Sequence, residues 1–286
     1  MTNILVTGAN GQLGSEINAI APKYDKYNFF FTDVKALDIT NKEAVQNYLT
    51  NNSINTIINC AAYTAVDKAE SEPALANNIN HLAVANFAQL AKDKNIKLIH
   101  ISTDYVFDGK AHTPYSETDL PNPPSVYGKT KLAGEQAMQK INPANSIIIR
   151  TSWVYSKYGN NFVKTMLRIA KERDEINVVA DQIGTPTNAA DLAQTILAIL
   201  PKIKNEEVEL YHYSNEGVCS WYDFAKAIFE IKGLTIPVYP IETSQYPTPA
   251  KRPFYAVLKK GSIKERYKIT IPYWKDSLAV CMSKMT

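Results

Sequence analysis

A glycine-rich turn near the amino terminus limits the folds open to this chain more than any other feature. The apolar residues 4–6 are followed almost at once by Gly8, Gly11 and Gly14. Glycine suits a strand-to-helix junction because the turn is tight, the helix packs near the strand, and a phosphate can approach the exposed amides. The spacing predicts a strand, a turn that binds the pyrophosphate of a dinucleotide, and a helix. The alternative is a turn that needs glycine for steric reasons alone.

An acidic residue agrees with the dinucleotide prediction. Asp33 follows the apolar residues 29–31 and Thr32, about twenty residues beyond the last glycine. A carboxylate at this place accepts hydrogen bonds from the adenosine ribose and repels a 2′-phosphate unless it is turned away. Lys35 is close enough in sequence to soften that repulsion. We therefore expect NADH to be accepted, and the choice between NADH and NADPH stays open.

Short β-rich runs alternate with helical patterns over most of the first two hundred residues, which is typical of repeated βαβ units. We expect an α/β fold, a Rossmann-type doubly wound parallel sheet with a smaller α/β substrate-binding domain. Residues 1–152 plus 176–204 would form the dinucleotide-binding domain, and 153–175 plus 205–286 the other. The expected strands are 4–7, 29–32, 56–60, 97–102, 146–150 and 176–180.

Composition excludes several other classes of protein. The net charge of +3 is too small for a nucleic-acid footprint. Cys60, Cys219 and Cys281 have no paired spacing, which argues against a disulfide framework and a zinc site. No apolar run approaches the length of a signal peptide core or a membrane span. We expect a cytoplasmic protein that binds neither nucleic acid nor membrane and holds no metal in its active site.

Polar residues follow three of the expected strands, and the carboxyl ends of parallel strands meet at one edge of a sheet. These residues are 61–64, 102–105 and 151–153. Between the last two groups, Tyr127 and Lys131 begin a helix, and their spacing places both on one face. Two further Tyr-x-x-x-Lys pairs occur, at Tyr222 and Tyr255, but neither has this context. A solvated surface pair is the ordinary alternative for Tyr127 and Lys131.

Tyrosine and lysine at this place predict a carbonyl reductase. A free tyrosine titrates near pH 10, and a neighbouring ammonium favours its phenolate. Lys131 would lower the pKa of Tyr127 and bond the nicotinamide ribose. Thr103, or else Ser102, would hydrogen-bond the substrate oxygen, and Tyr127 would give a proton to the alkoxide that forms during hydride transfer. The hydroxyl residues can also simply close a strand end.

These residues resemble those of the extended short-chain dehydrogenase/reductase family and, within it, of the dTDP-4-dehydrorhamnose reductases. The resemblance lies in the glycine turn, in Tyr127 and Lys131, and in four further runs. These are AAYTAVDKAE at 61–70, STDYVFDG at 102–109, RTSWVY at 150–155 and GTPT at 184–187. It implies reduction of the 4-keto group of dTDP-4-dehydro-L-rhamnose with NADPH or NADH.

The resemblance also implies site residues, in addition to Gly8 and Gly14 of the turn. At the sugar it places Thr103, Asp104 and Trp153, with Thr103 tuning the proton transfer from Tyr127. At the cofactor it places Gly11, Gln12, Leu13, Asp33, Asp38, Ile39, Ala62, Tyr63, Thr64, Tyr127 and Lys131.

Members of this family can pair into homodimers through Mg²⁺ held by carboxylates. Glu16 occupies a suitable position for this, but the sequence offers no carboxyl-terminal partner for it. The family motif Arg-Pro followed by Asn-Ser also changes here, since Arg252 and Pro253 precede Phe-Tyr-Ala.

Besides another sugar-nucleotide ketoreductase of the same superfamily, we consider three alternative functions. A 4,6-dehydratase would carry a glutamate where Tyr105 stands, which disfavours dehydration. An epimerase would reuse Tyr127 and Lys131 with a tightly held cofactor. A non-catalytic, nucleotide-binding regulatory subunit would keep only the fold.

Overall fold

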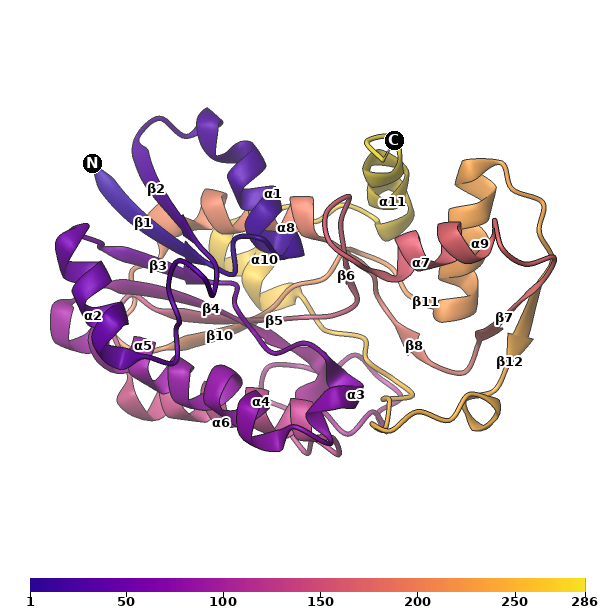
Figure 1. Cartoon of the computed structure of the whole chain (residues 1–286), viewed down its shortest axis with the longest axis horizontal. Coiled ribbons are helices and arrows are strands. Elements are labelled where there is room, and N and C mark those ends of the chain that lie inside the picture. The colour runs from indigo at the N-terminus through magenta and orange to yellow at the C-terminus, as the bar shows by residue number, and fades with distance from the viewer. Residues whose placement is uncertain (286) are drawn as a thin grey trace.

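The computed structural model describes residues 1–285 and has two parts (Figure 1). The larger part is a six-stranded sheet in the order β10-β5-β4-β3-β1-β2, and every pair in it is parallel. Its strands are β1 (Thr2–Thr7), β2 (Tyr27–Thr32), β3 (Thr56–Asn59), β4 (Lys97–Thr103), β5 (Ile147–Thr151) and β10 (Glu209–His212). This confirms the expected α/β fold class.

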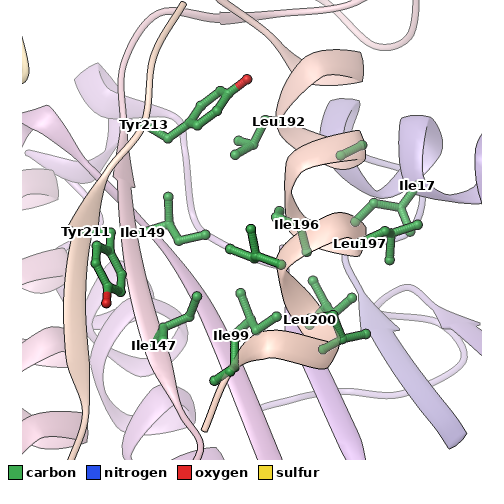
Figure 2. Packing of buried hydrophobic residues seen from close by; sticks show 14 of the residues in the cluster. Ile17, Ile99, Ile147, Ile149, Leu192, Ile196, Leu197, Leu200, Tyr211 and Tyr213 are labelled. Carbon is green, nitrogen blue, oxygen red and sulfur yellow. The ribbon is translucent and has the colours of Figure 1, made fainter. Parts of the chain in front are cut away.

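Helices cover both faces of this sheet, as Figure 1 shows. On one face lie α1 (Gln12–Ile20), α8 (Ala189–Ile199) and α10 (Gly261–Tyr267). In Figure 2, the isoleucine and leucine side chains of α8 interlock with those of β4 and β5. On the other face lie α2 (Lys42–Asn51), α5 (Ala83–Lys94) and α6 (Val126–Ile141). Burial on both faces explains the unbroken apolar runs of the central strands.

The smaller part lies beside one end of the sheet (Figure 1). Its core is formed by α7 (Phe162–Ile169), α9 (Trp221–Lys232) and α11 (Trp274–Met282). Three two-stranded sheets complete this region. They pair β7 (Ile176–Val179) with β12 (Val238–Ile241), β8 (Ile183–Gly184) with β11 (Cys219–Ser220), and β6 (Val154–Tyr155) with β9 (Thr187–Asn188).

One strand assignment made from the sequence is wrong. Residues 176–180 were expected to return to the main sheet, but β7 pairs with β12 in the smaller part. The sixth strand of the main sheet is β10, from the segment 205–286 that was expected to lie in the other domain. In β7, Ile176 and Val178 are buried and Asn177 is exposed, an alternation that suits the two-stranded sheet with β12. The open place in the main sheet is the edge beside β5, and β10 fills it.

Chain order reverses between β1 and β3, which are neighbours in the sheet. Such a switch point leaves a crevice at the carboxyl ends of the strands, where ligands of open α/β sheets bind. Two short helices, α3 (Val66–Ala69) and α4 (Pro73–Asn77), follow β3. Within residues 1–285, no helix is both long and apolar enough to cross a bilayer.

Candidate active site

A cleft of about 820 Å³ opens at the carboxyl ends of β1 to β5, at the switch point. Its walls include fourteen of the sixteen residues expected at the site from the sequence. Those fourteen are Gly8, Gly11, Gln12, Leu13, Asp33, Asp38, Ile39, Ala62, Thr64, Thr103, Asp104, Tyr127, Lys131 and Trp153. Gly14 and Tyr63 do not line it.

The glycine turn has the backbone that its sequence requires. Gly8 has a φ of +64°, and a Cβ there would lie 2.8 Å from the backbone of Ala61. A Cβ on Gly14 would lie 2.4 Å from the carbonyl oxygen of Gly8, so this glycine seats the helix against the turn. Helix α1 begins after Gly11, whose missing side chain cannot cap it. The first amides of α1 therefore face the cleft without a partner in the helix.

Asp33 is held in place at the end of β2. Its carboxylate accepts hydrogen bonds from Asn10 Nδ2 at 2.5 Å and from the amides of Lys35 and Ala36 at 3.1 Å. These three donors fix the carboxylate at the cleft. The Asp38 side chain is also held in place, because its Oδ1 accepts hydrogen bonds from both the amide and the hydroxyl of Thr40.

Tyr63 turns away from the cleft. Its hydroxyl donates to Glu72 at 2.5 Å, and its amide donates to Asn80 at 2.9 Å. Its neighbours Ala62 and Thr64 line the cleft, so the chain at Tyr63 runs beside the cleft while the Tyr63 side chain lies elsewhere.

Tyr127 and Lys131 lie on the first two turns of α6, which is capped by Ser125. Both are buried, with Tyr127 8% and Lys131 1% exposed. The Lys131 amine donates to the carbonyl of Ile101 at 2.6 Å and lies 3.3 Å from His100 Nε2. Burial lowers the pKa of Lys131 to about 8, while Glu135 opposes that shift.

The pKa of Tyr127 moves in the direction opposite to our expectation. Burial raises it above the usual 10, the charge of Asp104 adds to the rise, and a hydrogen bond with Thr103 opposes it. The Lys131 ammonium does not offset this rise. The amine of Lys131 is engaged by β4 instead, and the phenol of Tyr127 stays protonated at neutral pH.

Thr103 and Ser102 end β4 in different surroundings. The Thr103 hydroxyl donates to Asp104 Oδ1 at 2.9 Å at the wall of the cleft. The Ser102 hydroxyl donates to the buried carboxylate of Glu135. Both residues line the cleft, but the Ser102 hydroxyl is engaged by a buried charged residue, so Thr103, with its hydroxyl turned from Asp104, remains the candidate to contact a ligand.

Asp104 carries an unpaired oxygen at the wall of the cleft. Its side chain is buried, and its Oδ2 has no hydrogen-bond partner among the described residues. Burial raises its pKa to about 7, while the hydrogen bond from Thr103 works in the other direction. An unsatisfied buried oxygen of this kind fits a site where a ligand supplies the missing donor.

Trp153 lines the cleft together with Trp221, a residue that the sequence analysis missed. Its ring stacks on Trp221 with centroids 3.6 Å apart and an interplanar angle of 12°. Trp153 has a φ of +48°, and Gly184 packs so closely that a Cβ there would meet its ring at 2.6 Å. Ser220 and Asp223 form the capping box that starts α9, which predicts a helix but gives no sign that Trp221 reaches the cleft.

The changed Arg-Pro motif also lies near the site. Arg252 pairs with Asp67 at 2.6 Å, and its charge acts on the phenol of Tyr105, whose ring packs edge-on against Tyr127. Pro253 lies against Gly109, where a Cβ would come within 2.5 Å of it. The carboxyl-terminal segment is therefore fixed beside the cofactor-binding part.

The structure does not support a magnesium site at Glu16. This residue is 5% exposed and accepts a hydrogen bond from Ser156 at 2.6 Å, so its carboxylate faces the interior. Across residues 1–285, no group of three or more histidine, cysteine, aspartate or glutamate side chains is arranged to hold a metal ion. The three cysteines are free thiols.

Comparisons with known proteins agree with this geometry. A family model described as the RmlD substrate binding domain matches residues 1–286. The dTDP-4-dehydrorhamnose reductase of Aggregatibacter actinomycetemcomitans is 42% identical over 288 residues, which is 97% of each chain. The crystal structure of the dTDP-4-dehydrorhamnose reductase of Clostridium acetobutylicum is 44% identical, with a TM-score of 0.93 and 99% of each chain covered. That of the Bacillus anthracis reductase, in complex with NADP, is 41% identical, with a TM-score of 0.93, and covers 99% of this chain and all of that one. This chain belongs to the RmlD substrate-binding-domain family, in which dTDP-4-dehydrorhamnose reductases are found.

Proposed function

We propose that this protein reduces the 4-keto group of dTDP-4-dehydro-L-rhamnose to give dTDP-L-rhamnose, using NADPH or NADH. One observation carries the proposal: Tyr127, Lys131 and Thr103 converge in the same cleft as the glycine turn. Membership of the family supports the choice of substrate, because the relatives compared above are named for this reaction.

The residues present fit a dinucleotide. The unpartnered amides at the start of α1 would bind its pyrophosphate, and Gly8 leaves the backbone open there. Asp33 would accept the adenosine ribose, and Ala62 leaves room for the chain of the cofactor. Lys131 would bond the nicotinamide ribose. A reduced nicotinamide supplies the hydride when it is bound.

The pKa shifts indicate which groups carry a proton at pH 7. Tyr127 is neutral at pH 7 and so holds the proton that the substrate oxygen needs as it becomes an alkoxide. Lys131, with a pKa of about 8, is mostly charged at pH 7 and would stabilise the phenolate that Tyr127 becomes. Thr103 would hydrogen-bond the same substrate oxygen and keep it within reach of Tyr127.

The sugar would lie between β4 and the tryptophan pair. The unpaired Oδ2 of Asp104 would accept a hydrogen bond from a sugar hydroxyl. Trp153, stacked on Trp221, presents a flat apolar surface for the face of the sugar ring. These roles explain why polar and aromatic groups face each other across the cleft.

Three points of the sequence analysis stay predictions. They are acceptance of NADH beside NADPH, pairing into a homodimer, and location in the cytoplasm. Catalytic efficiency with each nucleotide tests the first, and a strong preference for NADPH would count against the role given to Asp33. Light scattering coupled to gel filtration tests the second.

The deciding experiment compares Tyr127→Phe with wild type in an assay of dTDP-4-dehydro-L-rhamnose and NADPH, followed by loss of nicotinamide absorbance. Removing a general acid lowers kcat by about a hundred- to ten-thousand-fold, and the affinity for NADPH should not change. Tyr222→Phe is the matched control, because Tyr222 has the same spacing to a lysine and does not line the cleft.

The alternatives give different results. Unchanged turnover by Tyr127→Phe would refute the assignment of the acid. Conversion of the sugar without stoichiometric consumption of NADPH would indicate an epimerase. Binding of NADPH by the wild type without any turnover would indicate a regulatory subunit.

A further inference from the structure

A row of buried polar side chains crosses the sheet beneath the cleft. Thr7, Asn59 and His100 lie on the neighbouring strands β1, β3 and β4 and are register partners in succession. They point to the α5 and α6 side of the sheet, like Leu5, Ile57 and Leu98 two residues before them. All three are at most 1% exposed. Polar groups in such a core are retained only where each has a partner.

Hydrogen bonds connect this row to Lys131. The Thr7 hydroxyl donates to Asn59 Oδ1 at 2.7 Å, and Asn59 Nδ2 lies 3.1 Å from His100 Nδ1. His100 Nε2 then lies 3.3 Å from the Lys131 amine. The other close contact of that amine is the carbonyl of Ile101 on the same strand. Two groups of β4, the Ile101 carbonyl and the His100 imidazole, thus contact the amine.

The orientation of the Asn59 side-chain amide decides which atoms donate and which accept hydrogen bonds along this row. With Oδ1 facing Thr7, Asn59 Nδ2 donates to His100 Nδ1, which leaves the ring proton on Nε2 facing Lys131. Only an uncharged amine can accept that proton, since an ammonium has donors alone. With the amide turned over, His100 carries its proton on Nδ1, and Nε2 accepts from the ammonium. Each orientation of the amide suits one form of Lys131.

We propose that His100, backed by Asn59 and Thr7, is a positioning residue that holds the Lys131 amine and, with the Asn59 amide turned over, accepts a hydrogen bond from its ammonium form. This inference rests on the proposed function, in which Lys131 acts beside Tyr127. His100 itself does not line the cleft, so it acts through Lys131.

The other groups around Lys131 limit what can tune it. Tyr127 and Glu135 lie one turn before and one turn after it on α6, and Glu135 is already paired with Arg150. Burial, and next the charge of Lys131, hold the pKa of His100 well below 6.5, so the imidazole stays neutral in the range where the enzyme would work. A neutral imidazole can accept a hydrogen bond from the ammonium without adding a second charge.

The test measures kcat against pH for wild type, His100→Leu and His100→Gln. In the wild type, kcat should fall as the pH rises through about 8, where Lys131 loses its proton. Leucine removes a partner of the buried ammonium, so this midpoint should move down by about one pH unit. Glutamine keeps a polar group that can accept a hydrogen bond from the amine and does not titrate. The midpoint of His100→Gln should therefore lie close to that of the wild type.

The result separates this inference from the proposed function. If Tyr127→Phe keeps full turnover, the proposed function fails whatever His100 does. If Tyr127→Phe is inactive but all three proteins share one midpoint, or His100→Leu lowers kcat equally at every pH, only the role of His100 is overturned. Thermal unfolding checks that each variant is folded. If His100→Leu is not, His100→Ala takes its place with the same downward midpoint expected, and a wild-type midpoint in that variant would overturn the role of His100.

Discussion

Replacing Glu135 by glutamine tests whether a buried ion pair supports the strand and helix that carry the site. Glu135 lies one turn after Lys131 on α6, and Arg150 lies on β5; their side chains are 1% and 3% exposed. Arg150 donates Nε to both carboxylate oxygens at 3.0 and 3.2 Å, and Nη2 to one of them at 2.7 Å. Ser102, next to Thr103, also donates to this carboxylate.

The geometry sets the size of the effect. Glutamine leaves the charge of Arg150 buried without an opposite charge, and such a change costs about 3–5 kcal/mol of the free energy of unfolding. With an unfolding entropy of about 2.1 cal/mol/K per residue, this lowers Tm by about 5–8 °C for a chain of this length. Urea unfolding and thermal unfolding, both followed by circular dichroism, measure the two quantities.

Two controls make the test specific. Glu172→Gln breaks an ion pair of similar length, Arg168 with Glu172 at 2.9 Å, but both side chains are more than half exposed. That change should cost less than about 1 kcal/mol. The double variant Glu135→Leu, Arg150→Met should recover most of the loss, because it removes both charges. Equal losses for Glu135→Gln and Glu172→Gln would refute the reasoning.

Two further predictions concern the cleft. Between about pH 4 and 7, folded Asp104 holds a proton that the unfolded chain has lost, so its contribution to stability falls as the pH rises, by about 4 kcal/mol in all. Asp104→Asn should therefore raise Tm at pH 8 and leave it unchanged near pH 4; an equal effect at both values would contradict this. Gly8→Ala forces a left-handed φ on alanine, which alone costs about 1–2 kcal/mol, and brings its Cβ against the backbone of Ala61. The total loss of stability should therefore exceed that figure, and NADPH binding, measured by calorimetry, should weaken. Gly261→Ala, where a Cβ meets nothing within 4 Å, is its control and should keep wild-type affinity.

The sequence predicts the parts of the site that depend on strand ends. Gly8, Asp33 and Thr103 come from different strands, yet the reading could place them together because parallel strands end at one edge of the sheet. The spacing of Tyr127 and Lys131 adds the helix that packs beside them. These inferences need only local patterns and one general rule of α/β folds.

What the sequence did not predict depends on contacts between distant segments. Trp221 reaches the cleft from the smaller part because its ring stacks on Trp153, and no local pattern specifies that contact. The place of β10 in the main sheet runs against local composition, because residues 209–212 (ELYH) are less apolar than residues 176–179 (INVV). The raised pKa of Tyr127, opposite to the expected shift, also depends on burial in the folded chain, as does the position of Lys131 against His100.

Burial acts in the same sense on the three titratable groups at the reacting end of the cleft. It raises the pKa values of Tyr127 and Asp104 and lowers that of Lys131, so each is pushed toward its uncharged form. For reduction this favours the correct starting state, because the acid must hold its proton until negative charge develops on the substrate oxygen. Once Tyr127 has given its proton, the phenolate and the Lys131 ammonium stabilise each other in surroundings that weakly solvate either charge alone. The cleft should therefore favour proton delivery over proton abstraction near neutral pH, and the reverse oxidation should need a higher pH.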